Sequence, residues 1–307
     1  GDFGAFISYL NLLTWPIMAM GWVTNLVQRG SASMRRINGI LEELPEITDP
    51  AQPVHIPQIR GKIEIEGLFF THPGQSFYAL KDIDLKIEAG DTIAVVGRVG
   101  AGKTTLLNSI TRLLDAPAGT VSVDGWNVRQ IPLQTLRKNI GFVTQEVFIF
   151  SDTIRNNVLF GRTGISQGHL TTVLHAAGII EDIETLEKGL DTFLGERGIT
   201  LSGGQRQRLT IARALILEPP ILILDDALSM VDTRTEEKIL NQILNLRQSK
   251  TNLIVSHRIS TIRRAERIAV LERGELVELG THENLLKKGG IYTTLYEKQL
   301  IAEELEG

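Results

Sequence analysis

One eight-residue stretch decides the fold: Gly97-Arg98-Val99-Gly100-Ala101-Gly102-Lys103-Thr104. It fits the pattern G-x-x-x-x-G-K-[ST], in which glycines let backbone N–H groups turn toward phosphate oxygens. The apolar run Thr92–Val96 precedes it, and a helical pattern follows. A helix that begins near Lys103 points the positive end of its dipole at the same anion. We therefore expect a nucleotide site, with Lys103 at the β- and γ-phosphates and Thr104 as a Mg²⁺ ligand.

A carboxylate at the end of a second strand supports this interpretation. The apolar run Ile221–Leu224 is followed directly by Asp225. Ligands of open α/β sheets bind at the carboxyl ends of strands. Asp225 is therefore expected to hold Mg²⁺, directly or through water.

The order of strand and helix patterns predicts an α/β fold with a mainly parallel core sheet. Further buried strands are expected at Ile140–Thr144 and Asn252–Ser256. Alternation of apolar and polar residues over Lys62–Phe70 and Ala79–Ile87 predicts a separate antiparallel sheet with one wet face. Residues 148–217 are expected to form a helical subdomain between two core strands.

The first 44 residues differ from the rest of the chain. Ala5–Val27 contains no charge, and as a helix it would extend about 35 Å, enough to cross a membrane core of about 30 Å. Arg29, Arg35 and Arg36 follow, which favours the cytoplasmic side for the remainder. A buried helix of a soluble domain is the alternative for this stretch. The spacing of apolar residues over Ser31–Leu44 predicts a cytoplasmic helical extension.

A proline-rich stretch separates this segment from the compact domain. Pro45, Pro50, Pro53 and Pro57 predict an extended linker over 45–60, which places the compact domain at 61–307. The chain begins at Gly1 rather than Met, so we expect it to be part of a longer protein.

Composition excludes several classes of protein. The formal net charge of −4 argues against a general nucleic-acid binder, which usually carries a basic face. The absence of cysteine excludes disulfides and thiolate metal sites. The six histidines show no metal-ligand spacing.

A second glycine motif, Leu201-Ser202-Gly203-Gly204-Gln205, carries a family resemblance. With the phosphate loop and Asp225 it resembles the nucleotide-binding domain of an ATP-binding cassette (ABC) transporter, whose signature sequence is LSGGQ. The resemblance runs from about Lys62 to the C-terminus. The first 30 residues also look like the end of the last membrane helix of a lipid or drug exporter. The resemblance implies an ATPase in the cell (inner) membrane that drives export of a lipid, drug or peptide-like substrate, whose identity the sequence does not give.

The resemblance implies roles for individual positions. Gln145 resembles the Q-loop glutamine that senses Mg²⁺ and the γ-phosphate, and His257 resembles the switch histidine that orients water. Ser229 and Asp232 match the ends of the D-loop, and Glu196-Arg197-Gly198 resembles the X-loop, with a solvated charged loop as the alternative. The expected ATP-binding residues are His72, Gly97, Arg98, Val99, Gly100, Ala101, Gly102, Lys103, Thr104 and Thr105. The expected Mg²⁺ ligands are Thr104, Gln145 and Asp225.

The family pattern also implies a dimer. By this resemblance the signature residues Leu201–Gln205 would cap the ATP held by a second ABC subunit, so each site would need two chains. Physically, Ser202 and the N–H groups of Gly203 and Gly204 would form an anion site at a helix N-terminus.

Two positions depart from the family pattern. Asp226 stands where the catalytic base is usually glutamate, which suggests slow hydrolysis and a heterodimer with a competent partner; a homodimer that uses Asp226 is the alternative. His72 stands where a tyrosine usually stacks on adenine, and a plain turn histidine before Pro73 is the alternative there. Other functions to be weighed are a soluble ABC ATPase of DNA repair or translation, an importer ATPase, and a regulatory nucleotide-binding subunit with little hydrolysis.

Overall fold

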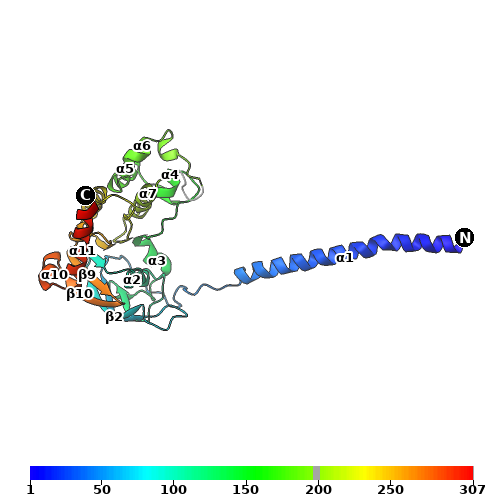
Figure 1. The fold of residues 1–307 in the computed structure, drawn as a ribbon, viewed down its shortest axis with the longest axis horizontal. Helices are drawn as coiled ribbons and strands as arrows, with labels where there is room; N and C mark the ends of the chain where they lie inside the picture. The colour runs from blue at the N-terminus through cyan, green and yellow to red at the C-terminus, as the bar shows by residue number, and fades with distance from the viewer. Residues whose placement is uncertain (196–200, 307) are drawn as a thin grey trace. The chain divides into compact units, whose positions relative to one another are not determined.

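The computed structural model describes residues 1–195 and 201–306 (Figure 1). Its contacts divide the chain into two compact units, Gly1–Thr48 and Asp49–Gly307. The second unit includes residues 49–60, which we predicted from the proline spacing to be part of the linker. Val54 N donates to Gln130 O at 3.0 Å, and Ile59 is 5% exposed in the core. The compact unit therefore begins before Gly61. The expected X-loop residues 196–198 lie outside the described residues.

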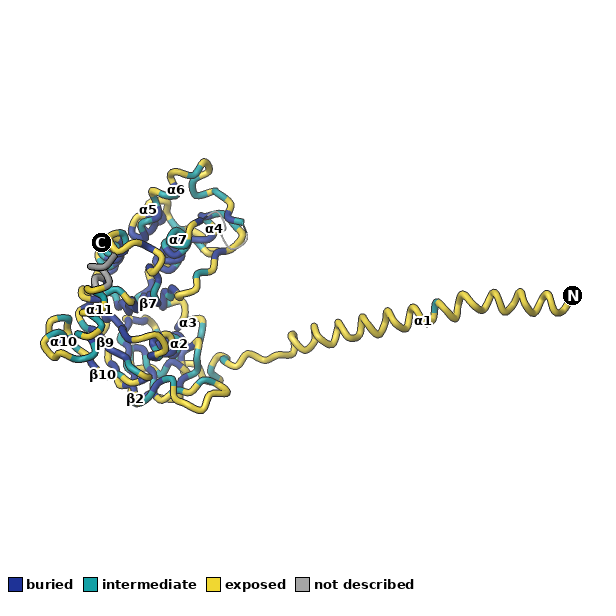
Figure 2. The backbone as a smooth tube through the Cα atoms, viewed as in Figure 1, coloured by how far each residue is buried: buried dark blue, intermediate teal, exposed yellow. Residues whose placement is uncertain are grey.

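The first unit is built on one helix, α1 (Asp2–Leu41), which has no buried residue (Figure 2). It joins the apolar stretch and the amphipathic stretch into a single element with Pro16 inside it. The helix ends at Leu41, three residues before Leu44. In the described part of the chain, α1 is the one helix that is long and apolar enough to cross a membrane.

A four-stranded antiparallel sheet opens the second unit. Its order is β2-β1-β4-β5, with β1 at Ile63–Phe70, β2 at Leu80–Ile87, β4 at Val121–Val123 and β5 at Trp126–Asn127. Ile63 pairs with Ile87 on one side and with Val123 on the other. All three side chains are buried, which gives the sheet one apolar face, as the alternation predicted.

The core sheet has six strands in the order β10-β9-β3-β8-β7-β6. Their bounds are β3 Thr92–Val96, β6 Ile140–Val143, β7 Ile221–Asp225, β8 Thr251–Val255, β9 Arg267–Glu272 and β10 Glu275–Gly280. All neighbours pair in parallel except β9 and β10, which are antiparallel. The expected α/β class is confirmed. Because the strands are parallel, their carboxyl ends meet at one edge of the sheet.

Helices cover the core sheet and fill the long connection between β6 and β7. That connection holds α4 (Ile154–Leu159), α5 (Gln167–Ala176), α6 (Ile180–Glu184), the 3₁₀ turn η1 (Gly189–Asp191) and α7 (Gly203–Leu215). Figure 1 shows α4 to α7 together at the end of the second unit that lies opposite β2 and β10. The other helices are α2 (Lys103–Ile110), α3 (Leu133–Lys138), α8 (Thr233–Leu246), α9 (Ile259–Ile262), α10 (His282–Lys288) and α11 (Ile291–Glu306).

The alternating side chains of β7 divide the core into two layers. Leu222 and Leu224 belong to the apolar cluster under the helical region, with Leu209 of α7. Ile221 and Ile223 belong to the cluster between the core sheet and the antiparallel sheet. The sheet is therefore covered on both faces. The carboxyl ends of its parallel strands are where a ligand can bind.

Candidate nucleotide-binding site

The loop between β3 and α2 is held tightly against neighbouring backbone. A Cβ on Gly97 would lie 2.2 Å from Leu271 O of β9, and one on Gly102 would lie 2.7 Å from Ala79 O. Gly97 and Gly102 also have φ of +155° and +100°, a region that favours glycine. Only glycine fits at either position, so the motif is required by packing as well as by phosphate binding.

Lys103 opens α2 and lies folded back over the loop. Its Nζ donates to Gly97 O at 2.8 Å and to Arg98 O at 3.0 Å, and the residue is 8% exposed. Burial lowers the pKa of Lys103, while Asp225 and Asp226 oppose that shift. The ammonium is thus largely removed from water and bonded to two carbonyl oxygens. An incoming anion could replace these carbonyls as the acceptor of its hydrogen bonds.

The carboxyl ends of β7 and β8 bring together the expected acids and His257. Thr104 Oγ1 donates to Asp225 Oδ2 at 2.8 Å, and Asp225 is 3% exposed. Burial is the main cause that raises the pKa of Asp225, and Asp226 adds to it. Asp226 follows in a left-handed conformation with φ of +51°, and its N–H donates to Val255 O at 2.9 Å. His257 comes two residues after β8 and is exposed.

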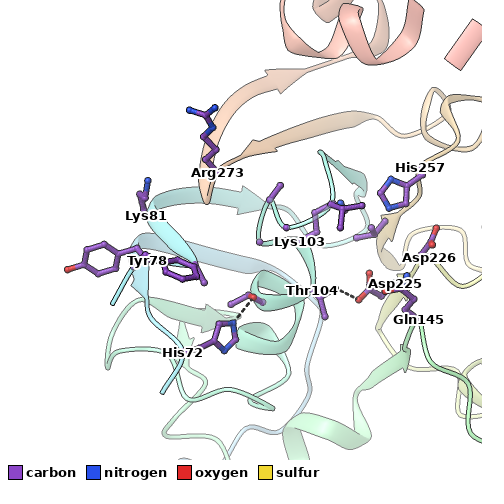
Figure 3. Close-up of a pocket in the computed structure, with 18 residues that line it drawn as sticks. His72, Tyr78, Lys81, Lys103, Thr104, Gln145, Asp225, Asp226, His257 and Arg273 are labelled. Atoms are coloured by element: carbon purple, nitrogen blue, oxygen red, sulfur yellow. Dashed lines mark hydrogen bonds between the residues drawn. The ribbon is translucent and has the colours of Figure 1, made fainter. Parts of the chain in front are cut away.

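A cavity of about 560 Å³ joins the loop to these strand ends. Figure 3 shows His72 and Tyr78 on one side of it, Gln145, Asp225, Asp226 and His257 on the other, and Lys103 and Thr104 between them. The expected residues that line it are His72, Val99, Gly100, Ala101, Gly102, Lys103, Thr104, Thr105, Gln145, Asp225, Asp226 and His257. Gly97 and Arg98 are not among its lining residues and instead supply the carbonyls that hold Lys103.

Sequence reasoning missed part of the cavity wall. Phe77, Tyr78, Ala79, Lys81, Val255 and Arg273 also line it. Tyr78 and Lys81 flank the start of β2, and Arg273 lies in the turn between β9 and β10. Gly274 of that turn packs on Ala79, where an added Cβ would lie 2.7 Å from the carbonyl oxygen. This approach joins segments almost 200 residues apart, and no local pattern signals it.

The residues at the strand ends fit a Mg²⁺ ion. The ion prefers oxygen ligands and usually takes one or two carboxylates together with substrate phosphates. Asp225 and Thr104 offer two oxygens already in contact, and Gln145 lines the same cavity. Among the described residues no group of three or more His, Asp or Glu could hold a metal by itself. This donor set therefore fits an ion that arrives with a phosphate.

His72 is anchored at the entrance of the cavity. Its Nε2 lies 3.2 Å from Thr105 Oγ1, and its ring meets Phe70 edge to face at 5.2 Å. These contacts fix the imidazole in the wall of the cavity.

The signature segment, Leu201–Gln205, lies outside this cavity and begins α7. Ser202 is the N-cap residue: its Oγ accepts from Gln205 N at 3.2 Å, and Gln205 Oε1 accepts from Ser202 N at 2.9 Å. This reciprocal capping box fixes the first turn of the helix. The N–H groups of Gly203 and Gly204 are left without helical acceptors, as at every helix start.

The turn 229–232 connects the end of β7, which carries Asp225 and Asp226, to α7 and α8. Ser229 Oγ donates to Asp226 O at 3.0 Å and accepts from Gln207 Nε2 at 3.0 Å. Asp232 caps α8 by accepting from Thr235 N at 3.0 Å, and this bond lowers the pKa of Asp232. Gln207, fully buried, was not among the expected site residues, although it lies two positions after the signature.

The comparisons with known proteins agree on one family. Residues 80–229 match the family model described as ABC transporter. The ATP-dependent lipid A-core flippase of Syntrophus aciditrophicus is 42% identical over 299 residues, which are 97% of this chain and 49% of the relative. The probable multidrug resistance ABC transporter ATP-binding/permease protein YheI of Bacillus subtilis is 38% identical over 307 residues, 100% of this chain and 52% of the relative.

A solved structure gives the same result. A bacterial Atm1-family ABC exporter with ATP bound matches with a TM-score of 0.83 and 33% identity, over 95% of this chain and 51% of that chain. The chain thus spans about half the length of the relatives that it matches. It carries the ATP-binding domain of the ABC transporters and belongs to that family.

Proposed function

We propose that this chain is the ATPase half, with the preceding membrane helix, of one subunit of a dimeric ABC exporter. The observation that carries the proposal is the single cavity that joins the phosphate loop to Asp225, Asp226 and His257. Relatives named as a lipid A-core flippase and a multidrug transporter support export as the direction of transport.

The proposed organisation has a membrane segment at 1–44, a short linker at 45–48 and a nucleotide-binding domain that begins at Asp49 rather than at Gly61, with its helical subdomain at about 148–217. The length and apolar surface of α1 support the membrane segment. Arg29, Arg35 and Arg36 favour a cytoplasmic nucleotide-binding domain at the inner membrane.

ATP binds in the cavity through backbone and cationic donors. N–H groups of Gly100 and Gly102 and the ammonium of Lys103 hold the β- and γ-phosphates. Thr104 and Asp225, with Gln145, hold Mg²⁺, which neutralises phosphate charge when bound. His72 presents its ring to the adenine.

Hydrolysis follows from the groups at the strand ends. A water oxygen bonds to the γ-phosphorus while the bond to the β–γ bridging oxygen breaks, which releases ADP and phosphate. The Asp226 carboxylate accepts the proton of that water, and His257 orients the γ-phosphate and the water. Lys103 stabilises the charge that shifts to the leaving oxygen.

Asp226 limits the rate of this step. Its side chain is one methylene shorter than glutamate, which draws the carboxylate back by about 1.5 Å. A misplacement of about 1 Å can cost on the order of 100-fold in rate. The left-handed backbone at Asp226 and its bond to Val255 O restrict any compensating movement. This favours a heterodimer in which the partner subunit supplies a glutamate, with a homodimer as the second possibility.

The signature segment completes the site of the opposite subunit. Ser202 and the N–H groups of Gly203 and Gly204 face the γ-phosphate held by the partner's phosphate loop. ATP then joins the two subunits, and hydrolysis releases them, which moves the attached membrane helices. The apolar α1 and the relatives' names disfavour the soluble ATPases of DNA repair or translation.

Measuring phosphate release by the full-length protein in liposomes tests the proposal. We expect Mg²⁺-dependent ATP turnover that Lys103→Ala abolishes, with Lys138→Ala as a control that removes an exposed cation of α3 outside the cavity. Tight ATP binding without any release would instead indicate a regulatory nucleotide-binding subunit.

A further inference from the structure

The short helix α6 carries a carboxylate that contacts the start of α7. Asp182 Oδ1 accepts from Gln205 Nε2 at 2.8 Å, and Asp182 Oδ2 accepts from Arg208 Nη1 at 2.8 Å. The Asp182 side chain is 27% exposed and that of Arg208 is 15% exposed. The carboxylate is therefore partly buried and is shared between two donors of one helix.

This contact decides the orientation of the Gln205 amide. A glutamine amide can turn over and exchange its oxygen with its nitrogen. An ionised carboxylate only accepts hydrogen bonds, so Asp182 requires Nε2 on its own side. Oε1 then faces Ser202 N, at 2.9 Å, and closes the capping box.

The capping box in turn sets what the signature segment offers to a ligand. Ser202 Oγ accepts from Gln205 N, so its own proton is free to be donated outward. Without the bond to Asp182, the amide of Gln205 could point its NH₂ group at Ser202 N, two donors would meet, and the first turn would open.

Arg208 makes a carboxylate tolerable beside an anion site. Its Nη1 donates to Gly178 O at 2.5 Å as well as to Asp182, and its Nε lies 3.4 Å from Gly204 O. The guanidinium thus balances the charge of Asp182 and ties α6 to the first turns of α7.

We propose that Asp182 is a positioning residue for the signature segment. It fixes the Gln205 amide and, through it, the Ser202 hydroxyl and the amides of Gly203 and Gly204 that receive phosphate. The phosphate part of this inference rests on the proposed function; the orientation of the capping box does not.

The first test is Asp182→Asn in the full-length protein. An asparagine can satisfy only one of the two donors, because its own NH₂ group must face Gln205 Nε2 or Arg208. Hydrogen exchange at the Ser202 and Gln205 amides, which make the two bonds of the capping box, should become about tenfold faster. The ATP KM should rise about tenfold with kcat changed less than twofold. Glu181→Gln is the matched control, since it removes an exposed charge from the same helix and should change neither quantity.

A charge swap separates positioning from a general loss of stability. In the double variant Asp182→Asn, Gln205→Glu, the carboxylate at position 205 accepts from Ser202 N and from the NH₂ group at position 182. The amide oxygen at position 182 accepts from Arg208. Slow exchange at the amides of residues 202 and 205 should return in this double variant, whereas Gln205→Glu alone, with two facing carboxylates, should exchange fast at both amides. Equal exchange rates in the double variant and Asp182→Asn would overturn the proposal. If the unaltered protein turns over no ATP, the proposed function fails, and the exchange rates still decide the role of Asp182.

Discussion

Replacing Gln207 by leucine tests the hydrogen bonds that connect α7 to the segment after β7, where Asp226 lies. The Gln207 side chain is completely buried, its Oε1 accepts from Met230 N at 2.9 Å, and its Nε2 donates to Ser229 Oγ at 3.0 Å. Ser229 Oγ donates onward to Asp226 O at 3.0 Å. Two hydrogen bonds therefore connect the helix that carries the signature to the backbone of the proposed base.

The structure gives the size of the effect. Leucine fills most of the same space but cannot bond to either partner, and Met230 N would face an apolar side chain. Each lost bond costs about 1 kcal/mol, and an amide left without an acceptor costs about 1–3 kcal/mol, so the total is about 2–4 kcal/mol. At about 2–4 °C per kcal/mol in a domain of this size, the unfolding temperature should fall by about 4–16 °C.

Thermal unfolding of the chain in detergent, followed by circular dichroism, measures this shift. Gln75→Leu is the control, because it makes the same chemical change at an exposed position and should leave the unfolding temperature within about 1 °C. If Gln207→Leu unfolds within about 1 °C of that control, the buried amide of Gln207 does not hold α7 to the turn 229–232.

Three further variants test the site itself. Asp225→Asn should raise the unfolding temperature without nucleotide at pH 7, because burial raises the pKa of Asp225 and so makes its ionised form destabilising. Differential scanning calorimetry should find that this gain shrinks as the pH is lowered and the natural carboxyl becomes protonated, and that Mg-ATP no longer stabilises the variant. Asp226→Glu should raise kcat by about 100-fold in a phosphate-release assay; an unchanged kcat would refute the short-carboxylate argument. His72→Tyr should lower the ATP KM severalfold with little change for kcat, since a phenol ring offers more stacking area to adenine; steady-state kinetics with ATP and GTP would detect it.

Local patterns predicted those parts of the fold where one segment alone decides the structure. Alternating apolar residues in β1 and β2 can be buried on one face only if the segments are strands, and the continuous apolar run of β3 fits a strand buried on both faces. The glycines after β3 mark the loop that follows it. The parallel core sheet is confirmed for the same reason, since Thr92–Val96 and Ile221–Asp225 are buried on both faces.

Partners distant in sequence explain what was missed. β9 begins with a charged residue, Arg267, and becomes a core strand only because it pairs with β3, in which Ala94 lies beside Ile268. β10 follows as an edge strand with alternating exposure. Their turn brings Arg273 to the cavity, just as β2 brings Tyr78 and Lys81, and neither approach has a signal within its own segment.

The polar contacts behind the site were also beyond sequence reasoning. The pattern LSGGQ identifies Ser202 and Gln205 but does not indicate that Asp182 holds the Gln205 amide, because α6 lies more than 20 residues earlier. Likewise, nothing local distinguishes Gln207 from a solvent-exposed glutamine. Such residues are found only once the helices are packed.

The central claim is that one chain's phosphate loop and the other chain's signature segment enclose the same nucleotide. A structure of the full-length protein trapped with Mg-ATP after Asp226→Asn measures this directly. We expect Ser202 Oγ and the amides of Gly203 and Gly204 to lie within hydrogen-bond distance of a γ-phosphate held by the adjoining subunit's phosphate loop. A trapped structure in which Ser202 faces solvent, with every triphosphate contacted by a single chain, would contradict it.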